Sequence, residues 1–107
     1  MATHPLDRLF ATIAARKSAG ETAKSYTAQL ISEGIEKCAK KFGEEAVETA
    51  LAAMSGDKRH LAEESADTLY HLMVLWAAAG LGPEDVYAAL AAREHRSGLA
   101  EKASRKI

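Results

Sequence analysis

Two pairs of acidic residues have the spacing that places both members on one face of a helix. Glu45 and Glu48 are three residues apart, and so are Glu64 and Asp67. Residues three apart are neighbours on a helix surface, so each pair brings two carboxylates together. Uncompensated negative charges are costly where water is partly excluded, and a bound cation removes that cost. If both segments are helical, the spacing therefore indicates a cation site.

The type of ligand restricts the choice of cation. Oxygen ligands alone favour Mg²⁺, Mn²⁺ or Ca²⁺ over zinc, and Mg²⁺ commonly binds through carboxylates together with substrate phosphates. The chain has no Glu-x-x-His pair, which a di-iron bundle needs, and no His-Glu-x-x-His motif of zinc proteases. We therefore predict a Mg²⁺ site that is open to a phosphorylated ligand. The alternative is that both acidic pairs are ordinary solvated surface charge.

The elements that must hold these pairs are predicted to be helices. No run alternates polar and apolar residues as a strand would, the 107 residues include 23 alanines, and both prolines stand where a helix could begin. The predicted fold is all-α, a bundle of about five helices. Their approximate bounds are 5–18, 25–33, 35–54, 58–79 and 83–97.

The two longest predicted helices carry the acidic pairs and are separated by a short stop and restart. Gly56 suits a left-handed C-cap, and Asp57 suits an N-cap. At about 100° per residue, both pairs lie at the border of an apolar face. If the two helices pack antiparallel, four carboxylates meet near their interface.

Size and apolar pattern predict a single domain, 1–107, that is completed by homodimerisation. Residues 69–76 are apolar almost all the way round a helix, which is typical of a helix covered on all sides. A chain of this length can hardly cover such a helix alone. A monomeric bundle with this helix at its centre is the alternative. We expect residues 99–107 to form a flexible basic tail.

Composition excludes several classes of protein. The formal net charge is −1, which gives no general attraction to nucleic acid or to an anionic membrane, and we expect neither partner. A single cysteine excludes an internal disulfide framework. The N-terminus lacks the pattern of a signal peptide, and no run of about 18 apolar residues occurs. We expect a cytoplasmic protein.

The acidic signature resembles that of the MazG-like all-α nucleoside-triphosphate pyrophosphohydrolases. The sequence blocks around it narrow the resemblance to the phosphoribosyl-ATP pyrophosphatase family of histidine biosynthesis. These blocks are residues 25–30, 40–48, 63–72 and 97–105. Cys38 stands where a larger aliphatic residue is common in that family, and Thr68 stands where leucine is common. We expect neither side chain to touch a proposed ligand.

The resemblance implies an enzyme that hydrolyses the α–β phosphoanhydride of phosphoribosyl-ATP. The products would be phosphoribosyl-AMP and pyrophosphate, in the second step of histidine biosynthesis. Glu45, Glu48, Glu64 and Asp67 would hold Mg²⁺, which would neutralise the phosphates and orient or activate water. Glu44 and Glu63 are both candidates for the general base or for a group that orients a metal ligand. The resemblance does not choose between them.

Basic residues are the candidates for holding the substrate phosphates. Lys37 and Lys41 fall on the same side of the helix as Glu48, and Lys102 and Arg105 lie in the C-terminal block that matches the family. The alternative for each is a solvated charge. His71 lies below Asp67 on the same face, either as a packing residue or as a partner of a ligand.

Two other functions stay open from the sequence. One is a house-cleaning nucleotide pyrophosphohydrolase that uses the same metal site. The other is a non-enzymatic helical dimerisation module.

Overall fold

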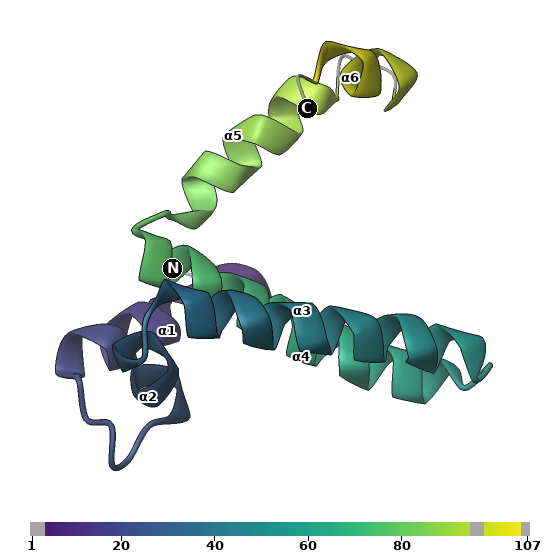
Figure 1. Ribbon diagram of the computed structural model, residues 1–107. Helices are drawn as coiled ribbons and strands as arrows, with labels where there is room; N and C mark the ends of the chain where they lie inside the picture. Colours follow the sequence, from purple (N-terminus) through teal and green to yellow (C-terminus); the bar gives the residue numbers. More distant parts are fainter. Residues whose placement is uncertain (1–3, 95–97, 106–107) are drawn as a thin grey trace.

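The computed structural model describes residues 4–94 and 98–105, and these residues form helices and loops only (Figure 1). The all-α prediction is confirmed. The six helices of this part of the chain are α1 Pro5–Ala19, α2 Tyr26–Ser32, α3 Ile35–Met54, α4 Lys58–Ala79, α5 Pro83–Arg93 and α6 Gly98–Ser104. Helices α3 and α4 have the predicted bounds. None of the described helices is both long enough and apolar enough to cross a membrane.

Helices α3 and α4 form an antiparallel hairpin whose turn is determined by the local sequence. Gly56 has φ +80°, a left-handed conformation that favours glycine and ends α3. The Asp57 carboxylate accepts hydrogen bonds from the backbone N–H groups of Arg59 and His60, at 3.0 and 3.2 Å. These bonds satisfy two N–H groups that a helix start leaves unpaired, so α4 begins directly after the turn.

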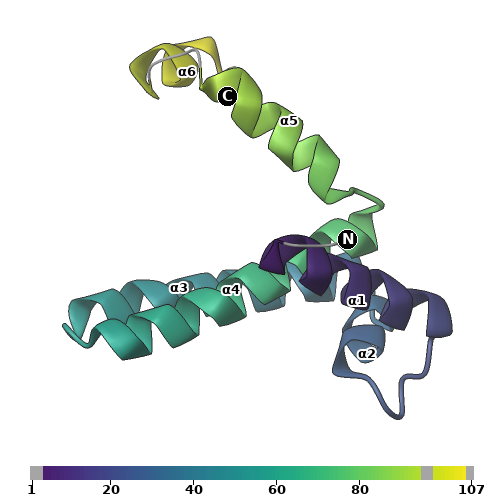
Figure 2. The same cartoon turned by 180° about the vertical axis from the view of Figure 1, so that it is seen from behind.

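The hydrophobic core lies at one end of this hairpin, where α1 and α2 pack against it (Figures 1 and 2). Lys17 of α1 adds a polar contact here, because its Nζ donates to the backbone oxygen of Ala77 at 2.8 Å. The buried residues of the core cluster are Ile13, Leu30, Cys38, Met73, Val74 and Ala77.

The other end of the hairpin extends beyond α1 and α2 (Figure 2). Three large apolar side chains of α3 are exposed there: Val47 at 60%, Leu51 at 65% and Met54 at 85%. The chain therefore leaves an apolar face of α3 uncovered next to the acidic pairs.

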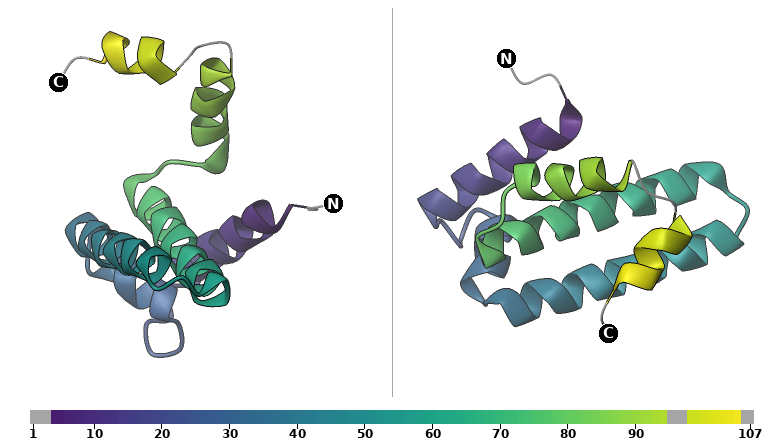
Figure 3. Two further views of the ribbon diagram at one scale, coloured as in Figure 1. Left: turned by 90° about the vertical axis from the view of Figure 1, so that its right-hand side faces the viewer. Right: turned by 90° about the horizontal axis from the view of Figure 1, so that it is seen from above.

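Helices α5 and α6 form an arm that leads away from the hairpin (Figures 1 and 3). Near its base, the Tyr87 hydroxyl donates to Asp7 Oδ1 of α1 at 2.9 Å. The predicted end of the fifth helix near residue 97 is wrong, because α5 ends at Arg93. The short helix α6, Gly98–Ser104, includes residues 99–104 of the predicted tail, 99–107.

Candidate metal and phosphate site

Three of the four predicted metal ligands converge between α3 and α4. Glu45 of α3 and Glu64 and Asp67 of α4 each offer a carboxylate oxygen, and these oxygens lie within 4.8 Å of one another. A point about 2.8 Å or less from all three atoms therefore exists, compared with about 2.1 Å for Mg²⁺–oxygen bonds. Small side-chain movements would bring all three carboxylates onto one ion, so the arrangement fits a hard divalent cation.

Glu64 distinguishes this group from an exposed acidic cluster. Its Oε1 atom is buried and has no hydrogen-bond partner among the described residues. A buried oxygen without a hydrogen-bond partner loses its hydration and gains no bond in exchange. This costs about 1–3 kcal/mol for a neutral group and more for a charged one. A cation held jointly with Glu45 and Asp67 would provide the missing partner.

Glu48, the fourth predicted ligand, lies beside this group and is exposed. It lines an open groove of about 470 Å³ along α3, so it faces the same region as Glu45 without belonging to the converging set. The groove is lined by Lys41, Glu44, Glu45, Val47, Glu48 and Leu51.

The two predicted lysines of α3 differ in their position relative to the groove. Lys41 lines the groove, and its Nζ lies 3.4 Å from Glu44 Oε1. The hydrogen bond to Glu44 raises the pKa of Lys41, which keeps the ammonium charged. Lys37 is one turn away, is paired with Glu33 at 3.9 Å, and does not line the groove. Of the two, Lys41 is therefore placed to meet a phosphate in the groove.

The two candidate bases also differ in position. Glu44 lines the groove next to Glu45. Glu63 is exposed, pairs with Arg59 at 3.5 Å, and is not among the residues that line the groove. Glu44 is therefore the one that borders the space next to the carboxylates.

The predicted phosphate ligands of the C-terminal block lie on the arm. Lys102 lies in α6, and Arg105 is the first residue after that helix. Both are exposed, and Figure 3 shows α6 at the far end of α5, away from the hairpin. The single chain therefore does not bring Lys102 and Arg105 to the carboxylates.

Two threonines lie at the same level as the carboxylates. Thr49 Oγ1 and Thr68 Oγ1 are 2.6 Å apart across the interface of α3 and α4. Thr68 Oγ1 also lies 2.9 Å from the backbone oxygen of Glu45, within donating distance. The expectation that Thr68 touches no proposed ligand is thus wrong. The Thr68 hydroxyl contacts Glu45, through the backbone oxygen of that residue.

His71 packs one turn beyond Asp67 and is 7% exposed. Its ring makes edge contacts with Tyr70 and Tyr26, at centroid distances of 4.9 and 6.1 Å. Burial lowers its pKa, although nearby carboxylates oppose this, so the imidazole is neutral at pH 7. Nδ1 has no hydrogen-bond partner among the described residues. His71 is therefore a buried neutral ring close to the carboxylates.

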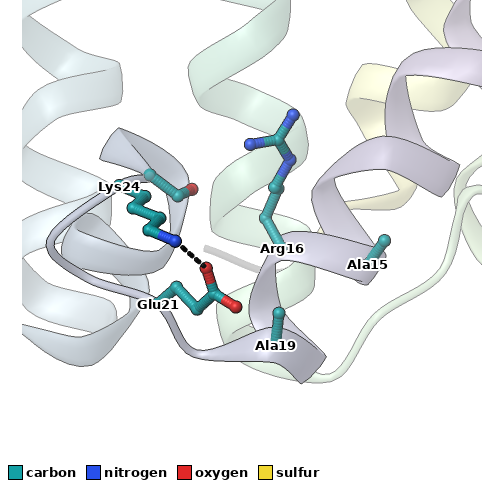
Figure 4. A pocket seen from close by; sticks show the side chains of 6 residues that line it. Ala15, Arg16, Ala19, Glu21 and Lys24 are labelled. Carbon is teal, nitrogen blue, oxygen red and sulfur yellow. Dashed lines mark ion pairs between the residues drawn. The ribbon is translucent and has the colours of Figure 1, made fainter.

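A second hollow, of about 300 Å³, lies where α1 meets the loop to α2 (Figure 4). Lys24 and Glu21 form an ion pair at 3.8 Å in its wall, and Arg16 points away from that pair. None of the predicted site residues lines it. This hollow is distinct from the groove beside the carboxylates.

Comparisons with known proteins identify the family. The sequence model described as phosphoribosyl-ATP pyrophosphohydrolase matches residues 6–94. A phosphoribosyl-ATP pyrophosphatase of Parvibaculum lavamentivorans is 59% identical over 100 residues, which cover 94% of this chain and 91% of that protein. The enzyme of the same name from Azospirillum brasilense is 59% identical over 101 residues, covering 94% and 90% of the two chains. With these similarities over nearly its whole length, the chain belongs to the phosphoribosyl-ATP pyrophosphohydrolase family.

Proposed function

We propose that the protein hydrolyses phosphoribosyl-ATP to phosphoribosyl-AMP and pyrophosphate, the second step of histidine biosynthesis, with Mg²⁺ as its metal. The observation that carries the proposal is the convergence of Glu45, Glu64 and Asp67, together with a buried Glu64 Oε1 atom that has no hydrogen-bond partner among the described residues. It occurs in a chain that is 59% identical to proteins named for this activity.

Each residue of the site has a role in this proposal. Glu45, Glu64 and Asp67 hold the cation, and Glu48 joins them from the groove or binds through a water. When bound, Mg²⁺ neutralises phosphate charge and makes a coordinated water more acidic. Glu44 accepts the proton of the attacking water, which is supported by its position beside Glu45 in the groove.

Positive charge in the groove supports phosphate binding. Lys41 presents an ammonium at the groove, and its pair with Glu44 at 3.4 Å can exchange for a phosphate oxygen. Lys37 is a second possible contact one turn away. Lys102 and Arg105 reach phosphates only if the arm meets a groove, either that of its own chain or that of a partner subunit.

The active form is proposed to be a homodimer. The uncovered side chains of Val47, Leu51 and Met54 support this. The shape of the chain also supports it, because the radius of gyration is 15.6 Å, against about 13 Å for a compact domain of this length. A second copy on the α3 face would cover the apolar side chains and deepen the groove beside the carboxylates.

The test is the release of pyrophosphate from phosphoribosyl-ATP, measured with Mg²⁺ and again with EDTA, with ATP and dCTP as control substrates. Metal-dependent release from phosphoribosyl-ATP alone is the expected result. Release mainly from a control nucleotide would favour a house-cleaning enzyme with the same metal site. No release, together with no effect of Mg²⁺ on the melting temperature, would favour a helical dimerisation module.

A further inference from the structure

The hydroxyl pair of Thr49 and Thr68 connects the two helices that carry the metal ligands. Each threonine lies four residues after a glutamate of the converging set, Thr49 after Glu45 and Thr68 after Glu64. Thr49 Oγ1 lies 2.9 Å from the Glu64 carbonyl oxygen on the opposite helix. Thr68 Oγ1 lies 2.9 Å from the Glu45 carbonyl oxygen, also across the interface. The pattern is therefore reciprocal, and both carbonyls belong to ligand residues.

Counting protons shows which of these bonds coexist. Each hydroxyl has one proton, and two oxygens 2.6 Å apart need a proton between them. One threonine therefore donates to the other, and the second donates to a carbonyl. If Thr49 donates to Thr68, then Thr68 donates to Glu45. In the reverse arrangement, Thr68 donates to Thr49, which donates to Glu64. Both of these arrangements make two bonds between α3 and α4. If Thr49 instead donates to the Glu45 carbonyl of its own helix, at 3.1 Å, only the bond between the two threonines crosses the interface.

A threonine in a helix often bonds only to the carbonyl four residues before it, which connects nothing to a neighbouring helix. Thr49 Oγ1 also lies 3.1 Å from that carbonyl, of Glu45, and donates to it only when it donates to neither Thr68 nor Glu64. The bonds across the interface are different, because they fix the distance between the backbones of Glu45 and Glu64. A side chain without a hydroxyl at position 49 or 68 could not make them.

We propose that Thr49 and Thr68 are a positioning pair that holds Glu45 of α3 at metal-binding distance from Glu64 and Asp67 of α4. This inference rests on the proposed metal site. Carboxylates that repel one another push the two helices apart when no cation is bound, and the hydroxyl bonds oppose that separation. The pair therefore keeps the three oxygens within 4.8 Å before the cation arrives, so less reorganisation is needed on binding.

The test is Mn²⁺ binding to the intact protein, measured from the electron paramagnetic resonance signal of free Mn²⁺. Valine replaces threonine at nearly the same volume but has no hydroxyl. We expect Mn²⁺ affinity to fall about tenfold in the double variant Thr49→Val/Thr68→Val, in line with groups that orient metal ligands. Each single variant loses less, because one bond across the interface remains. The double serine variant restores affinity, since serine keeps the hydroxyl.

A matched control separates this role from a general effect of losing a hydroxyl. The Thr12 hydroxyl of α1 donates to the backbone oxygen of Arg8, four residues earlier in the same helix, at 3.2 Å. Thr12→Val should bind Mn²⁺ like the wild type. The Mg²⁺ concentration for half-maximal activity should rise in the double valine variant by the same factor as the Mn²⁺ dissociation constant, with an unchanged KM for substrate.

The outcomes distinguish the two proposals. Unchanged Mn²⁺ affinity in a folded double valine variant would overturn the positioning role. So would a serine variant as weak as the valine variant, because the presence of the hydroxyl would then not account for the affinity. If the double variant does not fold, the single valine and serine variants decide by the same comparison. Failure of the wild type to bind Mn²⁺ would instead overturn the metal site.

Discussion

At the scale of single residues, Glu64 is the proposed metal ligand whose Oε1 atom is buried without a hydrogen-bond partner among the described residues. We expect Glu64→Gln to lower pyrophosphate release at least about 100-fold, since even groups that only orient metal ligands contribute about 10–100-fold. The variant should also lose the rise in melting temperature that Mg²⁺ gives the wild type. Activity assays and thermal melts with and without Mg²⁺ check both effects.

Glu36→Gln is the matched control, because Glu36 is an exposed glutamate in the first turn of α3. This variant should keep both the activity and the Mg²⁺ response. An active Glu64→Gln enzyme with a normal Mg²⁺ response would contradict the assignment of Glu64 as a ligand.

His71 gives a prediction about pH. Burial lowers the pKa of its folded form, so the unfolded chain takes up a proton near pH 6.5 before the folded one does. The stability that depends on the neutral ring is therefore present above about pH 6.5 and is lost as the pH falls through the lowered pKa of the folded form. Because one proton is involved, the free energy of unfolding changes by at most about 1.4 kcal/mol per pH unit. The ring is influenced, with opposing signs, by the charges of Lys41, Glu44, Glu45 and Asp67.

The measurement is the free energy of unfolding at pH 7 and at pH 5, for the wild type and for His71→Gln. The difference between the two pH values should be smaller in the variant, which lacks the titrating ring. His60→Gln, an exposed histidine of the same helix, should behave like the wild type. An equal pH dependence for all three proteins would show that His71 does not contribute.

Much of the candidate site was predictable from the spacing of residues, and the rest depends on helix packing. The three-residue spacing predicts that Glu64 and Asp67 act together, and they do lie within one group with Glu45. Whether Glu48 faces the same point depends on the rotation of α3 about its axis, which contacts between distant residues determine. Thr49 and Thr68 were missed as a pair, although each follows a predicted ligand by four residues.

At the scale of elements, the start of α4 depends on one side chain. Asp57 accepts hydrogen bonds from the N–H groups of Arg59 and His60. Asp57→Ala should destabilise the fold by about 1 kcal/mol, or roughly 4–8 °C in melting temperature for a domain near this size. Asp57→Asn should change it little, because asparagine caps helices about as well. Thermal melts at one protein concentration test this, and equal losses in both variants would contradict the role of the cap.

Helix bounds were predictable where the chain carries explicit end signals. Gly56 and Asp57 mark the turn of the hairpin, and Gly80 ends α4 with φ +78°. The end of α5 was misplaced because no glycine occurs between Pro83 and Gly98. Helix α6 has seven residues, or about two turns, which is too short for a hydrophobic period to distinguish it from a basic tail.

At the scale of the whole molecule, the two ends of the α3–α4 hairpin differ in how other helices cover them. Helices α1 and α2 cover one end of the hairpin, whereas the α3 face with Val47, Leu51 and Met54 is uncovered. The carboxylates lie between the two regions, so whatever covers this face also borders the groove. The proposed dimer would therefore link the stability of the fold to the closure of the site.

Leu51→Glu tests this link, because Leu51 is 65% exposed on that face and a charge there would be buried unpaired in a dimer. An unpaired buried charge costs several kcal/mol, so the dimer should dissociate roughly 100-fold more readily. Sedimentation analysis should find dimers for the wild type and monomers for the variant at the same micromolar concentration. Ala23→Glu, which adds the same charge to the exposed loop between α1 and α2, should remain dimeric. A dimeric Leu51→Glu protein would mean that the subunits associate through another face.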